Sequence, residues 1–326
     1  MADTHGRLGL IERLRDRRLL VVGRAGMDIY ADPPGTQIDH TDHFFAALGG
    51  SAGNIAVAAS RLGADTHLLS KVSDDAVGEF VKRQMQHYGV DSRYVYTAKG
   101  EARTSLAIVE TRPDARTVLY RNGAADLALD QHDCTTVPLE SFGVLVVTGT
   151  CLAVFPSREA VLSLMQRANA QGLVVVLDLD YRAYSWSSLV ETRMVYQQAC
   201  DLSHMIVGNE EEFAVVAGNA DDAQTFAQRL ADNNHYVIYK KGPRGLVAYA
   251  NGEHYEQTPF SVAMRKPMGA GDAFLGATLA ALVTGKGWQL ALREGAAAAA
   301  LNVTGIGCAP ANPDRAALDT FLAQHP

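Results

Sequence analysis

Short apolar runs that end in glycine or in a polar residue recur along the chain. Runs of this kind are typical of strands that are buried on both faces of a parallel sheet. They lie at residues 19–23, 144–149, 173–178, 205–209 and 236–240. We expect these segments to form the strands of a central sheet, with the closing polar residues at its carboxyl edge.

Segments with helical periodicity lie between and beside these runs. Apolar side chains recur there every three or four positions, which places them on one face of a helix. We expect helices at 54–62, 78–88, 157–171, 210–216 and 223–232, an apolar helix at 275–284 and an alanine-rich helix at 295–302. Strands that alternate with helices predict a doubly wound α/β fold, in which helices cover both faces of a mostly parallel sheet. Ligands of such sheets bind beyond the carboxyl ends of the strands.

Two segments depart from this rhythm. Residues 29–46 alternate in character and contain a Pro-Pro-Gly turn. Residues 104–121 have the pattern of two strands, 105–110 and 117–121, joined by the turn Arg112-Pro113-Asp114-Ala115. We expect these insertions to form a small β-sheet that stands off the main body as a lid or a dimer surface. Because the chain shows no internal repeat or linker, residues 1–326 are expected to form a single domain that carries this lid.

The composition indicates a large packed core and narrows the possible partners. The chain of 326 residues is 48% hydrophobic and 20% charged, and its formal net charge is −7. This acidic balance disfavours nucleic acid and anionic membranes as partners, because both require a positive surface. The four cysteines form no C-x-x-C pair, which indicates buried, reduced thiols. Since there is no signal-like segment and no apolar run long enough to cross a bilayer, we expect a cytoplasmic protein.

The segment Gly269-Ala270-Gly271-Asp272 carries the strongest chemical signal, because it directly precedes the apolar helix. Small residues let backbone N–H groups converge on an anion, and the start of the helix adds its positive end. An aspartate at this place can take a proton from an alcohol while the N–H groups stabilise charge on a transferring phosphoryl group. The same pattern also fits a glycine turn followed by an ordinary aspartate cap.

Three further motifs accompany this segment in order along the chain. They are the glycine-rich stretch from Gly49 to Ala56, the N-x-x-E element from Asn209 to Glu212, and the turn from Lys241 to Gly245. Together with Gly269 to Asp272, they resemble the PfkB/ribokinase family of carbohydrate kinases over nearly the whole chain, from about Leu19 to Pro313. The resemblance implies a ribokinase-like fold with a small β-sheet lid.

The resemblance also implies ATP-dependent phosphorylation of a sugar hydroxyl. Asp272 would accept the hydroxyl proton, and the backbone N–H groups of Gly269, Ala270 and Gly271 would hold the developing negative charge. Glu212 would act through water on Mg²⁺, an ion that usually keeps part of its hydration shell. The residues expected to bind ATP are Asn209, Lys241, Gly242, Gly245 and Asn302. For the element from Asn209 to Glu212, an ordinary asparagine cap with an acidic first turn is the alternative.

The family resemblance likewise implies which residues bind the sugar. The expected set is Asp28, whose carboxylate can accept hydrogen bonds from two hydroxyls, with Gly49, Gly50 and Asn54. A sugar acid also needs a partner for its carboxylate, and a guanidinium can bind it through two parallel hydrogen bonds. Arg121 in the lid and Arg182 after a core strand are the candidates. Arg182 could instead pair within the protein with Asp178 or Asp180.

Four stretches resemble one branch of the family, the sugar-acid kinases that act on 5-dehydro-2-deoxygluconate at its terminal C6 hydroxyl. These stretches are residues 23–28, 120–126, 156–161 and 177–186. Kinases of 2-keto-3-deoxygluconate share a similar Asp…Arg…Trp stretch, so that substrate, fructose and nucleosides remain alternatives. A non-catalytic sugar or nucleotide sensor on the same fold is a further alternative. A dinucleotide-dependent dehydrogenase is disfavoured, because residues 23–27 lack the G-x-G-x-x-G spacing.

One departure from the family pattern concerns a monovalent cation. Many members carry an acidic residue three positions before the Gly-Ala-Gly-Asp motif, where it helps to hold that cation. This chain has Lys266 at the position. We therefore expect weak or absent activation by potassium, with the ammonium group in the cation's electrostatic role. The family resemblance and the exposed edges of the expected lid also favour a homodimer that forms through the lid sheet.

Overall fold

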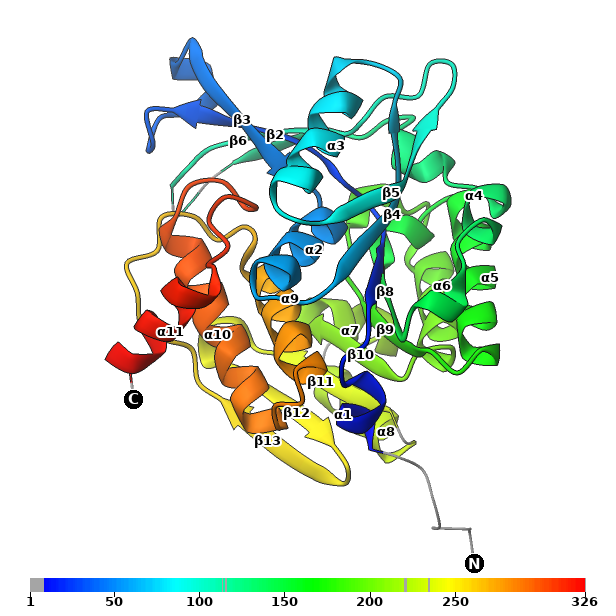
Figure 1. Ribbon diagram of the computed structural model, residues 1–326. Coiled ribbons are helices and arrows are strands. Elements are labelled where there is room, and N and C mark those ends of the chain that lie inside the picture. The colour runs from blue at the N-terminus through cyan, green and yellow to red at the C-terminus, as the bar shows by residue number, and fades with distance from the viewer. Residues whose placement is uncertain (1–8, 113, 115, 220–221, 234, 326) are drawn as a thin grey trace, which may run out of the picture.

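The computed structural model describes residues 9–325 except 113, 115, 220–221 and 234. Its main sheet has nine strands in the order β13-β12-β11-β10-β9-β8-β1-β4-β5, and only β12 and β13 run antiparallel to their neighbours (Figure 1). The strands are β1 (Leu19–Val22), β4 (Thr66–Ser73), β5 (Asp91–Ala98), β8 (Val144–Thr148), β9 (Val174–Asp178), β10 (Met205–Asn209), β11 (Tyr236–Lys240), β12 (Leu246–Ala250) and β13 (Glu253–Gln257). The predicted doubly wound α/β fold is therefore confirmed.

Two hydrophobic cores lie on the two faces of this sheet. One core includes side chains of α1 (Leu10–Leu14), α2 (Ser51–Arg61), α3 (Ala76–His87), α9 (Ala270–Val283), α10 (Trp288–Thr304) and α11 (Arg315–Gln324). The other includes side chains of α4 (Gln131–Thr135), α5 (Ser157–Ala170), α6 (Leu189–Asp201), α7 (Glu210–Ala217) and α8 (Ala223–Asp232). Successive residues of β1 point to opposite cores, as expected for a strand that is buried on both faces.

Short 3₁₀ helices occupy several of the connections. They are η1 (Ile38–His40), η2 (Ala125–Ala128), η3 (Leu139–Ser141), η4 (Gly149–Leu152), η5 (Ala183–Ser185) and η7 (Gly242–Arg244). All four cysteines are buried and unpaired, in agreement with the expected reduced thiols. Within the described ranges, we find no helix with both the length and the apolar character that a bilayer crossing requires.

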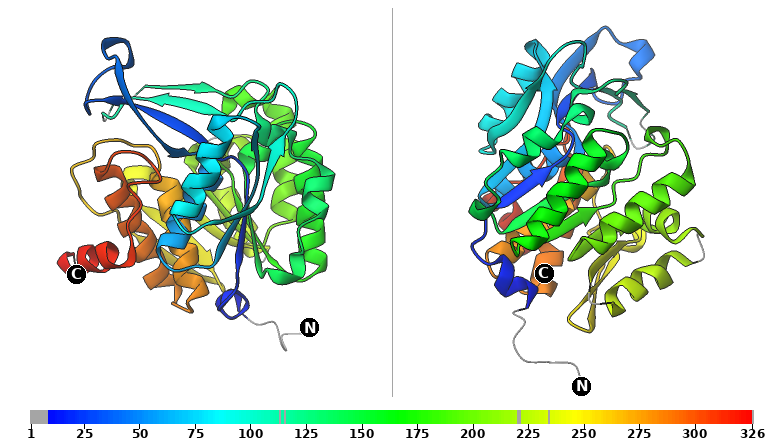
Figure 2. Two further views of the ribbon diagram at one scale, coloured as in Figure 1. Left: turned by 45° about the horizontal axis from the view of Figure 1, so that its top comes forward. Right: turned by 90° about the vertical axis from the view of Figure 1, so that its right-hand side faces the viewer.

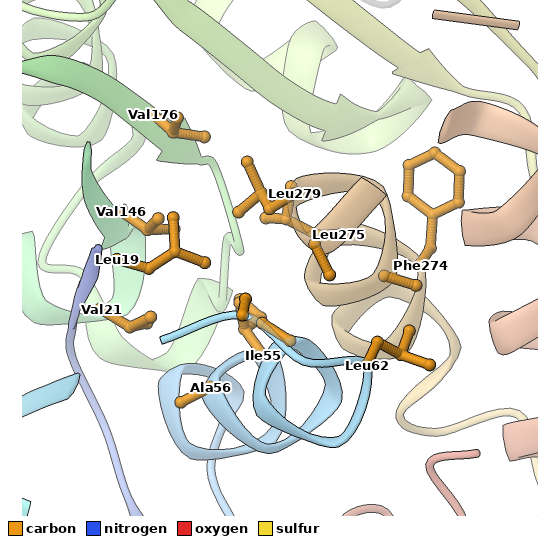
Figure 3. Packing of buried hydrophobic residues seen from close by; sticks show 14 of the residues in the cluster. Leu19, Val21, Ile55, Ala56, Leu62, Val146, Val176, Phe274, Leu275 and Leu279 are labelled. Carbon is orange, nitrogen blue, oxygen red and sulfur yellow. The ribbon is translucent and has the colours of Figure 1, made fainter. Parts of the chain in front are cut away.

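Helix α9 lies in the core between α2 and α10 and is apolar on every side. Figure 3 shows Leu275 and Leu279 of this helix facing Val146 and Val176 of the sheet, with Ile55 of α2 beside them. A helix that is surrounded by protein has no polar face to keep in water. This explains why the sequence between the Gly-Ala-Gly-Asp motif and Thr284 has no amphipathic pattern.

A second, four-stranded sheet has the order β3-β2-β6-β7 and stands away from the main sheet (Figure 2). It is formed by β2 (Gly26–Asp32), β3 (His43–Gly49), β6 (Leu106–Val109) and β7 (Thr117–Tyr120), and we call it the lid sheet. Strands β2 and β6 are parallel, and the two outer pairs are antiparallel. The predicted small sheet is confirmed, although Pro113 and Ala115 of the predicted turn lie outside the described residues.

The sequence pattern located the buried strands well and missed those with polar positions. Strands β10 and β11 and helix α8 have the predicted bounds. Strand β4 was not predicted, because His67 and Lys71 interrupt its apolar run. Helix α9 begins at Ala270 rather than at 275, since the glycine-rich motif itself forms its first turn.

Candidate active site

A cavity of about 520 Å³ lies between the lid sheet and the carboxyl ends of the main strands. Its wall combines residues of β2, β6 and β7 in the lid with residues at the ends of β9, β10 and β11. The first turns of α2 and α9 complete it. Nine residues predicted for the site line this cavity: Asp28, Gly50, Asn54, Arg182, Asn209, Glu212, Gly269, Gly271 and Asp272.

The start of α9 forms one end of this cavity. Gly269 has a φ of 87°, a left-handed conformation that glycine adopts without strain. A Cβ at this position would also lie 2.8 Å from Asn302 Oδ1. No side chain caps the helix, so the N–H groups of its first turn keep no intrahelical or capping partner. The helix therefore presents donors and a positive dipole end to an anion in the cavity.

Asp272 lies in this first turn and is held by α2. Asn54 Nδ2 donates to Asp272 Oδ2 over 2.9 Å. Burial raises the pKa of Asp272 to about 6, and the negative charge of Asp180 acts in the same direction. The hydrogen bond from Asn54 partly offsets this increase. A carboxylate with a pKa near 6 is suited to exchange a proton at neutral pH.

Strand β2 presents a second carboxylate from the lid side. Asp28 and Tyr30 alternate on the inner face of β2, and Tyr30 Oη donates to Asp28 Oδ2 over 3.0 Å. The Tyr30 hydroxyl in turn accepts from the backbone N–H of Cys308. A Cβ on Gly49 would overlap the Asp28 carboxylate, so glycine is required at this position to leave room for the Asp28 side chain. Burial raises the pKa of Asp28, while the positive charge of Arg24 lowers it.

Asn209 and Glu212 form a reciprocal cap at the start of α7. Asn209 Oδ1 accepts from the backbone N–H of Glu212, and the Glu212 carboxylate accepts from the backbone N–H groups of Asn209 and Tyr181. The ordinary helix cap that was the alternative interpretation is thus present. Both side chains also line the cavity, so capping and ligand binding are compatible.

Several acidic side chains face the cavity near this cap. Asp178, Asp180 and Glu212 all line it, and burial raises the pKa values of Asp178 and Glu212. Mg²⁺ accepts carboxylate oxygens directly or through its bound water, so the chemistry of these residues fits that ion.

Arg182 lines the cavity and is already engaged with protein acceptors. Its Nη2 lies 2.6 Å from Asp180 Oδ1, and its Nη1 donates to the backbone carbonyl of Tyr181 over 2.8 Å. The pairing with Asp180 that was weighed as an alternative is therefore realised. The side chain remains 43% exposed, so a ligand can still reach it.

Arg121 lies outside this cavity, which argues against its predicted role as a carboxylate ligand. It is 7% exposed, forms an ion pair with Asp126 and donates to the Thr150 carbonyl. It lines a neighbouring cavity of about 480 Å³ instead. The buried carboxylate of Asp126 already provides the negative partner that a substrate would have supplied.

Most of the residues predicted to bind ATP do not line the cavity. Asn302 is 1% exposed, and its amide is used by Lys266, Cys308 and Asn312, so the structure argues against a direct adenine contact. The other predicted positions that do not line the cavity are Lys241, Gly242, Gly245, Ala270 and Gly49. The turn at Gly242–Arg244 is held to the start of α7 by an ion pair between Arg244 and Glu210.

Lysine 240, rather than Lys241, reaches the cavity. It ends β11, and its Nζ lies 3.5 Å from Asp178 Oδ1. Burial alone would lower the pKa of Lys240, but the neighbouring carboxylates of Asp178 and Glu212 outweigh it and raise the pKa, so the ammonium stays charged. Lys240 is the polar residue that ends a predicted strand, and this position could have identified it as a cavity residue from the sequence.

Two other cavity residues were missed because local patterns do not reveal which way a side chain points. Tyr30 could have been found from its alternation with Asp28 along one strand. Arg24 directly follows the first buried strand and lies in the stretch 23–28 that resembles the sugar-acid kinases, but no local pattern shows that its side chain lines the cavity.

Lysine 266 is fully buried beside the start of α9. Its Nζ donates to the backbone carbonyl of Met268 and to Asn302 Oδ1, each over 2.8 Å. Burial lowers the pKa of Lys266, while the carboxylates of Asp272 and Asp28 raise it. A cationic side chain is thus built into the loop that precedes the anion-binding turn.

Solved structures of sugar kinases share this fold. A fructokinase from Xylella fastidiosa with bound ATP superimposes with a TM-score of 0.82 at 23% identity, covering 94% of this chain and 98% of that chain. A ribokinase II of E. coli in complex with ATP and Mg²⁺ gives a TM-score of 0.84 at 22% identity, covering 94% and 99%. These similarities establish the ribokinase-like fold.

Sequence comparison identifies the family. Residues 16–315 match the model described as pfkB family carbohydrate kinase. The 5-dehydro-2-deoxygluconokinase of Photobacterium profundum is 40% identical over 317 residues, covering 94% of this chain and 96% of the relative. The protein of the same name from Geobacillus kaustophilus is 34% identical over 313 residues, covering 94% and 93%. The chain, whose cavity combines an uncapped helix start with a buried aspartate, therefore belongs to the pfkB family of carbohydrate kinases and is a phosphotransferase.

Proposed function

We propose that this chain transfers the γ-phosphoryl group of ATP to the terminal C6 hydroxyl of a sugar acid, 5-dehydro-2-deoxy-D-gluconate. The observation that carries the proposal is the position of Asp272 in the uncapped first turn of α9, in the wall of the cavity between the lid sheet and the main sheet. The names of the relatives at 40% and 34% identity support this substrate. The guanidinium groups of Arg24 and Arg182 in the cavity wall also favour an acid over a neutral sugar.

Asp272 acts as the general base in this proposal. The hydroxyl oxygen of the sugar bonds to the γ-phosphorus, the bond to the β,γ-bridging oxygen breaks, and ADP leaves. The Asp272 carboxylate takes the proton that the hydroxyl loses. The hydrogen bond from Asn54 fixes the orientation of this carboxylate and favours its ionised form.

The start of α9 and nearby side chains stabilise the transferring group. Gly271 and Asp272 line the cavity, and their N–H groups have no capping partner, so they can donate to the phosphoryl oxygens. The Lys240 ammonium lies on the same side, since a Cβ on Gly271 would be 3.5 Å from its Nζ. Glu212 would act through water on Mg²⁺, which supplies further positive charge to the phosphates when it is bound, and Asn209 would help to position the triphosphate.

The lid side of the cavity binds the sugar. Asp28, held by Tyr30, can accept from two hydroxyls of the substrate. Gly50 and Asn54 at the start of α2 and Arg182 also lie in the cavity wall. Since residues of β2, β6 and β7 line one side of the cavity, the bound sugar is shielded from water on that side, which limits transfer of the phosphoryl group to water.

The proposed activity can be tested with a panel of acceptors and one active-site variant. We expect 5-dehydro-2-deoxygluconate to give the highest kcat/KM, above 2-keto-3-deoxygluconate, fructose and nucleosides. Asp272→Asn should fold and bind ATP but lower kcat by on the order of 10²–10⁴, as for a lost general base. The matched control is Asp319→Asn on the exposed face of α11. A higher kcat/KM for another acceptor would reassign the substrate, and near-normal turnover by Asp272→Asn would refute its role.

The raised pKa of Asp272 predicts the acidic limb of the pH profile. Because the ionised carboxylate is the base, kcat/KM should fall as the pH drops through about 6. Asn54→Ala removes a hydrogen bond that lowers this pKa, so the limb should move to higher pH. Both profiles can be measured at saturating ATP and Mg²⁺. A limb near pH 4 in the wild type, or no movement in the variant, would contradict the assignment.

The buried ammonium of Lys266 predicts that potassium has little effect on activity. The Met268 carbonyl and the Asn302 amide oxygen, which would be available to a cation in this loop, already accept from Lys266. Rates in potassium chloride and in tetramethylammonium chloride should agree at equal ionic strength. ADP should be measured directly by chromatography, so that no auxiliary enzyme responds to the cation. A strong potassium requirement would refute this role for Lys266.

We also propose that two copies associate through the lid sheet. Its outer strand β7 exposes Val118 and Tyr120, and the opposite outer strand β3 exposes Phe44. Unpaired strand edges with apolar side chains favour pairing with another chain. Light scattering should give twice the mass of the chain, and Val118→Lys should shift it to the monomer. Leu290→Lys, on α10 away from the lid, is the control. A monomeric wild type would refute the dimer.

A further inference from the structure

Arg24 sits at a tightly fixed point of the backbone, directly after β1. Its carbonyl accepts from the backbone N–H of Gly53 in the first turn of α2. A Cβ on Gly50, which has a φ of 92°, would lie 2.5 Å from this carbonyl oxygen. The start of α2 therefore packs directly on the main chain of Arg24. With its backbone held in this way, the side chain lines the cavity.

The Arg24 guanidinium differs from the other cationic groups of the cavity wall in having no partner. Arg182 contacts Asp180 and the Tyr181 carbonyl, and Lys240 lies beside Asp178. Within the part of the chain that the structure describes, Arg24 has no side-chain hydrogen bond or ion pair, and its Nη1 is buried without an acceptor. A buried donor without an acceptor is destabilising, and donors of this kind are normally satisfied. The other N–H groups of the guanidinium also have no acceptor among the described residues, and because Arg24 lines the cavity, a ligand there can bind them.

The place of Arg24 in the chain indicates which side of the cavity it lines. Arg24 lies between the end of β1 and the start of β2, the lid strand that carries Asp28. The positive charge of Arg24 also lowers the pKa of Asp28. Arg24 therefore belongs to the part of the cavity wall that adjoins the lid.

The ligand group that best matches Arg24 is a carboxylate. The cavity wall already contains five acidic side chains, which repel an anionic substrate unless a cation faces it: Asp28, Asp178, Asp180, Glu212 and Asp272. A guanidinium presents two parallel N–H donors that fit the two oxygens of a carboxylate. A neutral hydroxyl would leave part of this fork unused.

We propose that Arg24 is the specificity-determining residue of this kinase and binds the substrate carboxylate while the opposite, terminal hydroxyl lies at Asp272. This inference rests on the proposed function, because it requires the substrate to be an acid. It also assigns distinct parts to the two arginines of the wall. Arg24 binds the carboxylate of the substrate, and Arg182 stays paired with Asp180 near the hydroxyl that is phosphorylated.

The test compares an acid with its neutral analogue. The acid is 5-dehydro-2-deoxygluconate, and the analogue carries a hydroxymethyl group in place of the carboxylate. Arg24→Gln should raise KM for the acid by about 10–100-fold, as expected for the loss of a charged hydrogen bond, with little change in kcat. KM for the analogue should change little. Arg83→Gln on the exposed face of α3 is the matched control and should resemble the wild type.

Arg24→Lys keeps the charge but loses the fork, so its KM for the acid should lie between those of the wild type and Arg24→Gln. If circular dichroism shows that Arg24→Gln does not fold, the test rests on Arg24→Lys. A KM of Arg24→Lys for the acid equal to that of the wild type would then overturn the proposal. Equal KM increases for acid and analogue in either variant would overturn the role of Arg24 while leaving the proposed function intact. A wild type that phosphorylates no sugar acid would refute the proposed function, and the role of Arg24 with it.

Discussion

The close contact between α2 and α9 is the constraint on which the site depends. A Cβ on Gly276 would lie 2.5 Å from Ala58 Cβ and 2.6 Å from the Ile55 carbonyl, so only glycine permits this approach. The two helices are far apart in sequence, yet both begin at the cavity. Their contact brings Asn54 within hydrogen-bonding distance of Asp272. Because α9 is enclosed by apolar neighbours, its first turn is held rigidly where an anion must bind (Figure 3).

Burial raises the pKa values of several acidic groups in the cavity. The chain carries a net charge of −7, and several of its carboxylates gather at the ends of the central strands. Removing them from water raises the pKa values of Asp28, Asp178, Glu212 and Asp272. Lys240, Lys266 and the arginines counter this negative charge locally. The net charge of −7 disfavours extended polyanions as partners, whereas cationic groups in the cavity wall can bind small anions.

The lid sheet connects substrate binding to the main body. Strand β2 begins only a few residues after β1, so Arg24 and Asp28 lie on one short path from the centre of the main sheet into the lid. Beside Asp28 in the same sheet, Ala107 and Val109 of β6 and Leu119 of β7 add apolar side chains to the cavity wall. The same sheet leaves an apolar outer strand exposed, which is why binding of the sugar and association of two chains are expected to involve one element.

The sequence by itself determined the fold class, the central strands and the phosphoryl-transfer motif. Buried strands such as β10 and β11 are continuous apolar runs, and the Gly-Ala-Gly-Asp segment needs its small residues wherever it occurs. Only the tertiary structure decided which polar side chains share the cavity. Arg121 and Arg24 each follow a strand in the sequence, but Arg121 pairs with the buried Asp126, whereas Arg24 lines the cavity and has no side-chain partner among the described residues. The partner of a buried charge is set by segments that are distant along the chain, and a local pattern does not contain that information.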